Sequence, residues 1–362
     1  MLKTALHDFH RGAGAKLVDF AGWEMPVVYS GIIEEHHYTR EHCSIFDVSH
    51  MGRLEFRGGS AEAFLEKLCT RRIGDMKLGQ SRYSHVCRED GGILDDVIVS
   101  KHDGYFGMVV NASNREKLLG WFGKRRPADL EIRDLTLETV MVAVQGPEAI
   151  DTMQRLLPLP VNDLKRYHFK TGEVMGAVYT IFRSGYTGED GLEIVIPARL
   201  APAAMQLLIA NAEEIGRPIK PAGLGARDTL RMEAAMPLYG HELTEDWDSI
   251  TAGQTWCVDL TKEFIGQPVL AKVKQSPRRQ VAGFSLEGKR IARQGAKILS
   301  SGREVGVVTS GTQSPTLNKV IAMGLLDAPL CTPGTRVEFD LRGTAASGVV
   351  TPLPFYKRAK AS

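Results

Sequence analysis

The stretch G-G-I-L-D-D-V-I-V (Gly91–Val99) is a glycine turn followed by apolar and β-branched residues, which predicts a strand. Side chains alternate between the two faces of a strand, so Asp95 and Asp96 point to opposite faces. If both faces are covered, at least one carboxylate lies among apolar neighbours, where it needs a partner or an altered pKa. The alternative is a turn carboxylate that caps local backbone amides, and both interpretations remain open from this stretch alone.

Short strands and single helices surround this stretch. A hairpin signal at His102–Gly104 joins the predicted strand to a second one at Tyr105–Val110. Pairs of strands that alternate with single helices predict an α+β fold rather than a doubly wound parallel sheet. Further strands are expected at Arg53–Arg57, Ser81–Cys87, Val140–Val144, Val178–Arg183 and Leu192–Ile196, and helices at Ile32–His42, Ser60–Leu68, Asn111–Phe122, Ala201–Ile215 and Leu224–Ala235.

The last part of the chain has a different pattern. A basic, proline-containing connector at Lys272–Arg279 is followed by β-type alternation with regular glycine turns. This pattern predicts a separate small β-barrel or sandwich from about residue 280.

Length, charge and cysteine usage narrow the class of protein. A chain of 362 residues is expected to form two or three domains. The formal net charge of +2 gives no reason to expect nucleic acid or a membrane as the main partner, and no apolar run is long enough to span a bilayer. The five scattered cysteines form no C-x-x-C pair, which argues against a disulfide framework and favours a cytoplasmic location.

A second notable loop is G-Y-T-G-E-D-G-L-E (Gly185–Glu193) between two predicted strands. Tyr186 offers a flat ring with a hydroxyl group. Glu193 can accept two parallel hydrogen bonds from a planar pair of N–H groups. The alternative is an ordinary surface glutamate on a half-exposed strand.

Arg227 lies in the first turn of a predicted helix, in G-L-G-A-R-D-T-L-R (Gly223–Arg231). The helix dipole disfavours a cation at this end, so the position indicates a role toward a ligand or a buried carboxylate. The Gly-x-Gly lacks the third glycine and the preceding strand of a dinucleotide-binding fingerprint.

The histidines do not predict a metal site. Glu34 and His37 form a single E-x-x-H, whereas a di-iron bundle needs a second pair and bridging glutamates. The run D-V-S-H-M-G (Asp47–Gly52) brings Asp, Ser and His together, but no G-x-S-x-G nucleophile elbow exists. We interpret that run as a pocket wall or a structural turn.

Six motifs follow one another along the whole chain. They are A-G-W-E-M-P (Ala21–Pro26), F-D-V-S-H-M-G (Phe46–Gly52), G-G-I-L-D-D (Gly91–Asp96), the Gly185–Glu193 loop, the Gly223–Arg231 segment and T-S-G-T-Q-S-P-T-L (Thr309–Leu317). In this order they resemble the aminomethyltransferases, the T-proteins of the glycine cleavage system.

The resemblance implies an α+β protein with a three-domain cloverleaf around a central folate-binding opening. Mixed and antiparallel sheets with helices would form the first two domains, and a β-barrel the third. The expected boundaries are 1–52 with 138–240 for the folate-binding domain 1, 53–137 with 241–279 for domain 2, and 280–362 for the C-terminal barrel.

The resemblance also implies an activity. The methylene carbon of the aminomethyl group on the lipoyl arm of H-protein would pass to tetrahydrofolate, which releases ammonia and forms methylenetetrahydrofolate and dihydrolipoyl H-protein. Tetrahydrofolate would be a co-substrate, and no metal is expected. The lipoylated H-protein would be the partner, functionally with the P- and L-proteins, and neither nucleic acid nor a membrane is expected.

Matching positions imply roles for particular residues. Asp96 would be the catalytic carboxylate, close to the folate nitrogen that attacks the carbon, and Asp95 would be structural. Folate-binding residues would be Glu193 at the amino-pyrimidinone edge of the pterin, Arg227 beside it, and Tyr83, Tyr186, Met51 and Tyr356 along the pocket.

Two other functions remain as alternatives. One is a folate-dependent demethylase of the same fold, acting on a methylated sulfur or nitrogen compound, because a fold does not fix a function. The other is a non-catalytic folate-binding protein, which would be expected to lack the aspartate pair.

Overall fold

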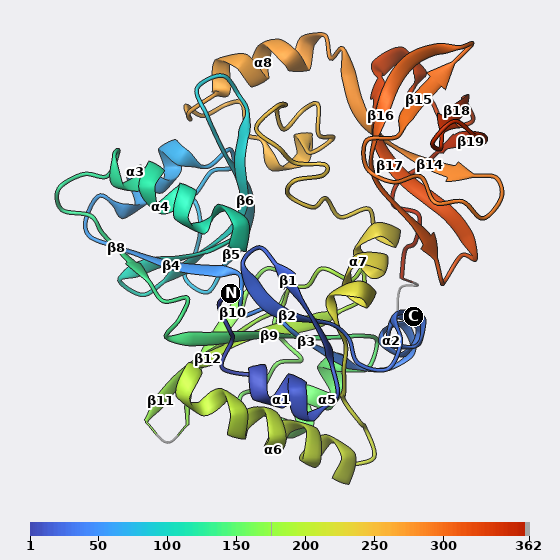
Figure 1. Cartoon of the computed structure of the whole chain (residues 1–362). Helices are drawn as coiled ribbons and strands as arrows, with labels where there is room; N and C mark the ends of the chain where they lie inside the picture. Colours follow the sequence, from blue (N-terminus) through green and yellow to red (C-terminus); the bar gives the residue numbers. More distant parts are fainter. Residues whose placement is uncertain (175, 359–362) are drawn as a thin grey trace. The chain divides into compact units, whose positions relative to one another are not determined.

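Mixed helices and antiparallel strands confirm the predicted α+β class in the computed structural model, which describes residues 1–174 and 176–358. The described part of the chain forms a two-stranded, a five-stranded and a six-stranded sheet and a closed barrel (Figure 1). Within that part, no helix has both the length and the apolar character needed to cross a membrane.

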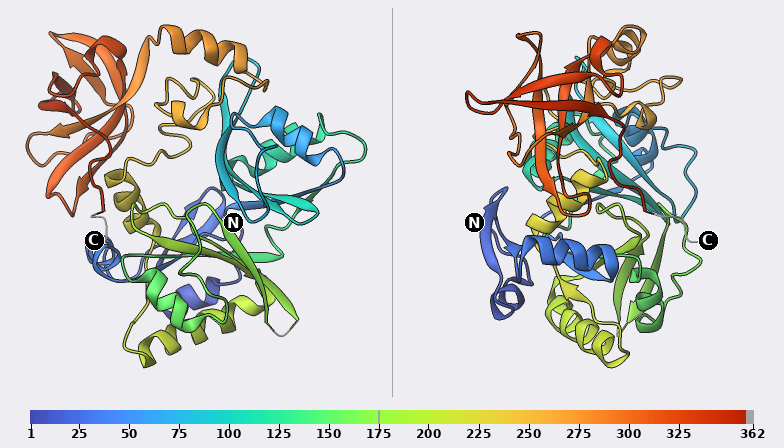
Figure 2. Two further views of the ribbon diagram at one scale, coloured as in Figure 1. Left: turned by 180° about the vertical axis from the view of Figure 1, so that it is seen from behind. Right: turned by 90° about the vertical axis from the view of Figure 1, so that its right-hand side faces the viewer.

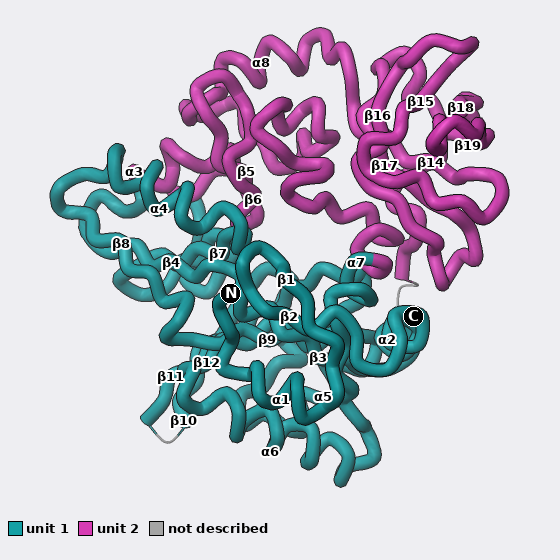
Figure 3. Tube along the Cα trace, in the orientation of Figure 1, with its two compact units in different colours: residues 1–62, 75–82, 98–228 teal, residues 63–74, 83–97, 229–362 magenta. Residues whose placement is uncertain are grey.

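The chain divides into two compact units (Figure 3). The first unit comprises residues 1–62, 75–82 and 98–228, and the second comprises residues 63–74, 83–97 and 229–362. The chain passes from one unit to the other within three elements that matter for the site, namely β5 (Ser81–Cys87), β6 (Ile93–His102) and α7 (Leu224–Glu233).

The six-stranded sheet belongs to the first unit. It consists of β3 (Ser44–Asp47), β9 (Thr139–Gln145), β10 (Phe169–Val174), β11 (Ala177–Phe182), β12 (Gly191–Pro197) and β13 (Lys220–Pro221). The order is β10-β11-β12-β9-β3-β13, and only the pair β13–β3 is parallel. The two strands predicted on either side of the Gly185–Glu193 loop are β11 and β12, which pair antiparallel and place Glu193 opposite Phe182.

Helices α1 (His7–Gly12), α5 (Ala149–Leu156) and α6 (Ala201–Glu214) cover one face of this sheet (Figures 1 and 2). Alternate residues of β9 and β12, such as Val142, Leu192 and Ile194, pack in the same core as these helices. Because side chains alternate along a strand, Glu193 points to the opposite face of the sheet.

The start of α7 is held against the N-terminal segment of the first unit. This segment contains β1 (Lys16–Phe20), β2 (Trp23–Val28) and α2 (Ile32–Glu41). The buried Glu35 carboxylate accepts hydrogen bonds from the backbone N–H groups of Tyr29 (2.6 Å) and Gly223 (2.8 Å). A Cβ at Gly223 would lie 2.4 Å from the backbone carbon of Val27, so only glycine allows this close approach, which fixes where the first turn of α7 begins.

The five-stranded sheet carries the aspartate pair. It has the order β5-β6-β7-β4-β8, with β4 (Gly52–Arg57), β7 (Tyr105–Val110) and β8 (Glu131–Asp134). β6 pairs with β7 down to His102 opposite Tyr105, which confirms the predicted hairpin. Two helices close to these strands in the sequence are α3 (Ala61–Leu68) and α4 (Arg115–Gly123).

The closed barrel in the second unit confirms the predicted C-terminal β-structure. Its strands are β14 (Arg279–Leu286), β15 (Lys297–Ser300), β16 (Arg303–Ser314), β17 (Lys319–Asp327), β18 (Arg336–Asp340) and β19 (Ala345–Thr351), in the order β14-β17-β16-β15-β18-β19. Phe284 and Phe339 meet edge to face in its core, with ring centroids 5.3 Å apart. The first half of the predicted connector Lys272–Arg279 is the last turn of α8 (Gln267–Gln275), where two lysines suit the negative end of the helix dipole.

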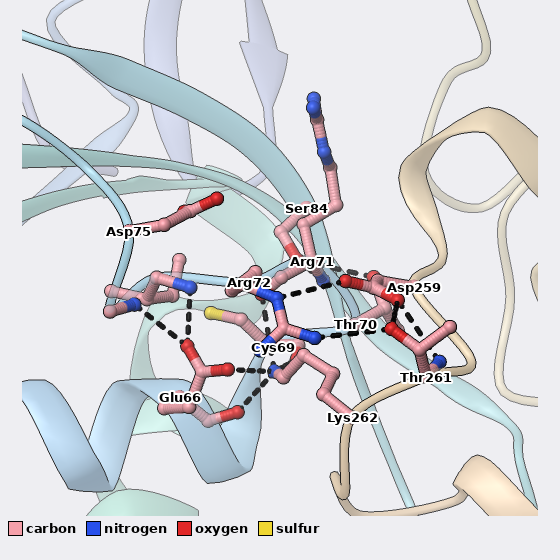
Figure 4. A network of polar contacts seen from close by, with 12 residues as sticks. Glu66, Cys69, Thr70, Arg71, Arg72, Asp75, Ser84, Asp259, Thr261 and Lys262 are labelled. Atoms are coloured by element: carbon pink, nitrogen blue, oxygen red, sulfur yellow. Dashed lines mark hydrogen bonds and ion pairs between the residues drawn. The ribbon is translucent and has the colours of Figure 1, made fainter.

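A buried lysine ties two parts of the second unit together (Figure 4). The Lys262 ammonium donates to the backbone carbonyl oxygens of Glu66 in the last turn of α3 and of Cys69 (2.6 Å) and Arg71 (3.2 Å) just after that helix. Burial lowers the pKa of Lys262, and the Cys69 and Glu66 side chains oppose that shift. The contact holds residues 66–71 beside the segment around residue 262, and Thr70 Oγ1 adds a hydrogen bond of 2.7 Å to the Cys257 carbonyl.

Candidate active site

Glu193 is buried in the first unit, with 7% of its surface exposed. The Ser184 hydroxyl donates a hydrogen bond to Glu193 Oε2. The alternative of an ordinary surface glutamate is therefore wrong. A carboxylate is costly to bury unless polar or charged groups surround it, so the neighbours of Glu193 define what it can do.

Arg227 is the charged neighbour that matters most. Its guanidinium carbon lies 4.8 Å from the centroid of the Tyr186 ring, which places the cation over the aromatic face. Burial lowers the pKa of Arg227, and the nearby Glu193 and Tyr186 oppose that shift. Arg227 Nη1 is buried and, among the described residues, has no hydrogen-bond partner. The structure thus brings Glu193, Arg227 and Tyr186 together as predicted and leaves one N–H direction open for an acceptor.

Gln145 at the end of β9 forms hydrogen bonds that anchor the loop carrying Tyr186. The Gln145 side chain accepts from the Thr187 hydroxyl (3.0 Å) and donates to the Ser184 carbonyl (3.1 Å). Arg40 of α2 donates to the Thr187 carbonyl at 2.7 Å. These contacts fix the loop backbone while the Tyr186 ring stays partly exposed.

His50 joins this cluster, although the sequence interpretation left its role open between a pocket wall and a structural turn. Its Nδ1 is buried and has no hydrogen-bond partner within the described chain. Burial lowers the pKa of His50 to about 4, with Arg227 and Arg53 acting in the same direction and Asp47 opposing them. The ring is therefore neutral at pH 7. The next residue, Met51, is partly exposed, and its carbonyl accepts from Arg53 Nη1 at 2.5 Å.

Asp47 and Ser49 of the same motif have a structural role instead. Asp47 Oδ2 accepts from Thr4 (2.7 Å) and lies 2.8 Å from His10 Nε2, and Oδ1 accepts from the Ser49 backbone and hydroxyl. His10 Nδ1 lies 2.8 Å from the Tyr29 hydroxyl. Every one of these side-chain groups has a partner within the protein, which supports the structural turn for this half of the motif.

The two aspartates of β6 differ in exposure within the second unit. Asp95 is fully buried, whereas Asp96 is partly exposed. The Tyr83 hydroxyl of β5 donates to Asp96 Oδ2 at 3.1 Å. A charge-assisted hydrogen bond of this kind fixes the carboxylate and still leaves it accessible. The structure brings Tyr83 and Asp96 together, as expected for residues of one site.

Trp256 was missed by the sequence interpretation. It lies in a short 3-10 helix (Thr255–Cys257), stacks on Tyr83 with ring centroids 5.2 Å apart and an interplanar angle of 18°, and is 56% exposed. The guanidinium of Arg71 lies 5.9 Å from its ring centroid. A single tryptophan in an irregular segment has no periodicity, so the sequence held no signal for this contact.

Tyr356 lies in the tail beyond the barrel. Its backbone N–H donates to the Glu233 carbonyl at the end of α7 (2.8 Å), and the Glu233 carboxylate accepts from Ser314 (2.5 Å) and Thr316 (3.0 Å). These bonds fix the tail in the second unit. The folate-binding roles of Tyr356 and Met51 stay predictions.

Comparisons with known proteins cover nearly the whole chain. Residues 6–262 match the family model described as the GCVT N-terminal domain, and residues 279–357 match the glycine cleavage T-protein C-terminal barrel domain. The chain is 42% identical over 366 residues to an aminomethyltransferase of Geobacillus kaustophilus (99% of this chain, 100% of the relative). It is 45% identical over 363 residues to one of Rubrobacter xylanophilus (99% and 95%).

A solved structure agrees with these relatives. The glycine cleavage system aminomethyltransferase T from Bartonella henselae matches with a TM-score of 0.91 and 34% identity, covering 98% of each chain. Family models over both parts of the chain and relatives of matching length lead to one conclusion. The chain belongs to the aminomethyltransferases, the T-proteins of the glycine cleavage system.

Proposed function

We propose that Asp96 is the catalytic carboxylate of this aminomethyltransferase and that Glu193 and Arg227 recognise the pterin of tetrahydrofolate. The family uses tetrahydrofolate as co-substrate. In the reaction, the methylene carbon leaves the aminomethyl group on the lipoyl arm of H-protein. Its bonds to sulfur and to nitrogen break, and two bonds to folate nitrogens form, so ammonia and a free thiol are released without any oxidant.

Asp96 has the properties that this chemistry needs. Positive charge develops at the transferred carbon as its bond to sulfur or nitrogen breaks, and a fixed carboxylate stabilises such charge. The observation that carries the proposal is that Asp96 is accessible while the Tyr83 hydroxyl holds its Oδ2. Asp95 next to it is fully buried and cannot reach a substrate. An ionised carboxylate in this position can also accept a proton from the attacking folate amine.

Glu193 and Arg227 have complementary hydrogen-bonding capacity. The amino-pyrimidinone ring of a pterin carries adjacent N–H donors, which a carboxylate accepts in pairs, and a carbonyl oxygen, which a guanidinium can bind. The buried Nη1 of Arg227, which has no partner among the described residues, supports such an acceptor. The Tyr186 ring already carries this guanidinium over one face, so the cation is oriented before any ligand binds.

For the protein partner and the cellular location, the proposal rests on family membership and on the cysteines. Membership of the family implies H-protein as the partner, with the P- and L-proteins acting in the same system. All five cysteines are free thiols, which supports the expected cytoplasmic location.

One variant tests the catalytic role directly. In Asp96→Asn the side-chain volume is kept and the charge is lost, so we expect turnover to fall by at least about a hundredfold while the Kd for tetrahydrofolate changes by less than about threefold. The assay supplies aminomethylated H-protein and tetrahydrofolate and measures ammonia and methylenetetrahydrofolate. Asp103→Asn is the matched control. It makes the same chemical change at an exposed hairpin turn, so it should leave turnover unchanged.

The same assay separates the alternatives. If wild-type protein released no ammonia but demethylated a sulfonium or amine substrate, it would be a folate-dependent demethylase. Folate binding without turnover of either substrate would indicate a non-catalytic folate-binding protein. Near-normal turnover of Asp96→Asn would remove Asp96 from the chemistry.

A further inference from the structure

A line of polar side chains extends from Asp96 into the interior of the second unit. Tyr83, His85 and Cys87 occupy alternate positions of β5 and therefore share one face of the strand. The Tyr83 hydroxyl lies 3.2 Å from His85 Nε2, His85 Nδ1 lies 2.8 Å from Ser249 Oγ, and Ser249 Oγ lies 3.8 Å from Cys87 Sγ. Every member beyond Tyr83 is fully buried.

The protonation states along this line are set by burial. Burial lowers the pKa of His85 to about 3, so its ring is neutral at pH 7 and carries a single N–H. Burial likewise raises the pKa of Cys87 to about 12, so the thiol keeps its proton. Tyr83, His85 and Ser249, which lie between Cys87 and Asp96, thus each have one proton to donate. All hydrogen bonds along the line must therefore point in the same direction.

The carboxylate at the end selects the direction. An ionised carboxylate only accepts hydrogen bonds, so the single Tyr83 proton points to Asp96. The Tyr83 oxygen can then accept from His85 only if the imidazole proton is on Nε2. Nδ1 is left as an acceptor for the Ser249 hydroxyl, whose oxygen accepts from the Cys87 thiol. In the opposite direction Tyr83 would donate to His85, and Asp96 would lose this donor.

We propose that His85 is a positioning residue for the transfer reaction: it holds the Nε2–H tautomer and thereby fixes the Tyr83 hydroxyl as a hydrogen-bond donor to Asp96. The inference rests on the proposed catalytic role of Asp96. His85 touches no reacting atom and acts only through Tyr83. Stacking on Trp256 fixes the plane of the Tyr83 ring, and the hydrogen bond from His85 fixes the rotation of its hydroxyl.

Two substitutions at His85 separate its two nitrogens. In His85→Gln the amide nitrogen reaches the position of Nε2 and can still donate to Tyr83, whereas His85→Asn reaches only the Nδ1 side. We expect His85→Asn to lower kcat by about tenfold to a hundredfold, the value of one hydrogen bond to a charged group, with little change in the KM for tetrahydrofolate. His85→Gln should stay within about threefold of wild type. In a Tyr83→Phe background, His85→Asn should have no further effect on kcat.

The tautomer gives a readout that does not depend on activity. In the full-length protein with 15N-labelled histidine, the imidazole shifts of His85 should report a neutral Nε2–H ring at pH 7. Ser249→Ala removes the donor to Nδ1, so a share of Nδ1–H tautomer should appear even if the His85 variants fold poorly. A wild-type Nδ1–H ring, an imidazolium, or equal kcat losses in His85→Gln and His85→Asn would overturn the inference.

The two proposals fail in different ways. Full turnover in Asp96→Asn would remove the catalytic role of Asp96 and with it the purpose of the line. An inactive Asp96→Asn together with a fully active His85→Asn would leave the catalytic role intact and contradict only the role of His85.

Discussion

Two buried polar clusters of the first unit share one short motif and differ in how fully they are bonded. Around Asp47, each carboxylate oxygen and each ring nitrogen of His10 has a partner within the protein. Around Arg227, the buried atoms Arg227 Nη1 and His50 Nδ1 have none in the described part of the chain. His50 lies three residues after Asp47, so the motif D-V-S-H supplies Asp47 and Ser49 to the first cluster and His50 to the second.

The difference separates stabilisation from binding. A buried polar group without a partner costs about 1–3 kcal/mol, whereas a bonded one contributes modestly to stability. Selection for stability alone would favour a hydrogen-bond partner for every buried polar group, around Arg227 as well as around Asp47. The buried atoms of Arg227 and His50 that have no partner within the described residues, which we call the open cluster, therefore indicate a ligand that supplies the missing hydrogen bonds. The bonded group around Asp47, with Thr4, His10 and Ser49, is the closed cluster, and it holds α1 to β3. Substitutions in the two clusters should accordingly fail in different assays.

The largest expected effect is in the closed cluster. Burial alone would raise the pKa of Asp47, but hydrogen bonds from His10, Ser49 and Thr4 lower it below its ordinary value. Asp47→Asn removes the charge that these donors surround, and we expect the free energy of unfolding to fall by about 3 kcal/mol. Denaturant unfolding at pH 7 measures this loss.

The affinity of this variant for tetrahydrofolate, in contrast to its stability, should be nearly unchanged. The folded fraction of Asp47→Asn should bind tetrahydrofolate within about twofold of wild type, because no residue of the open cluster is changed. A much weaker Kd with unchanged unfolding would show that Asp47 belongs to the binding site, and the comparison would break.

The elements themselves were largely predictable from local patterns. The Gly91–Val99 stretch predicted a strand that the structure extends to His102, and the hairpin at residues 102–105 followed from a glycine turn between two β-type runs. The misfit of a cation in the first turn of α7 drew attention to Arg227, which the structure places near the buried Glu193 and over the Tyr186 ring. In each case the signal lay within about ten neighbouring residues, where propensity and periodicity act.

What could not be predicted depends on pairings distant in sequence. His10 meets Asp47 across 37 residues, and His85 meets Ser249 across 164. Such contacts depend on the register of strands and on turns that have no periodicity. His85 itself reads as one more polar residue of a strand, and only the side chains on either side of it reveal a directed line of hydrogen bonds.

A substitution in the open cluster sharpens the comparison with an intermediate effect. Arg227→Met keeps the length of the side chain and removes a guanidinium whose Nη1 has no partner among the described residues. The contact with the Tyr186 ring and the attraction to the buried Glu193 are lost, while the cost of burying an Nη1 that the described chain leaves without a partner is also removed. The free energy of unfolding should therefore fall by less than the loss of about 3 kcal/mol expected for Asp47→Asn. The Kd for tetrahydrofolate should rise by about tenfold to a hundredfold, measured by calorimetry. An unchanged Kd with reduced stability would make Arg227 structural.

The smallest expected effect is a pH dependence at His50. Burial, helped by Arg227 and Arg53 and opposed by Asp47, lowers its pKa from the ordinary 6.5 to about 4. Between these values the unfolded chain binds more protons than the folded one, so stability is complete above pH 6.5 and falls as the pH is lowered toward 4. From pH 7 to pH 6 the loss due to His50 should be on the order of 1 kcal/mol or less. Burial also lowers the pKa values of His85 and His102, so the measurement is the difference between wild type and His50→Gln in denaturant unfolding at the two pH values. Equal slopes would mean that His50 is already bonded in the folded protein, and the open cluster would then be confined to Arg227.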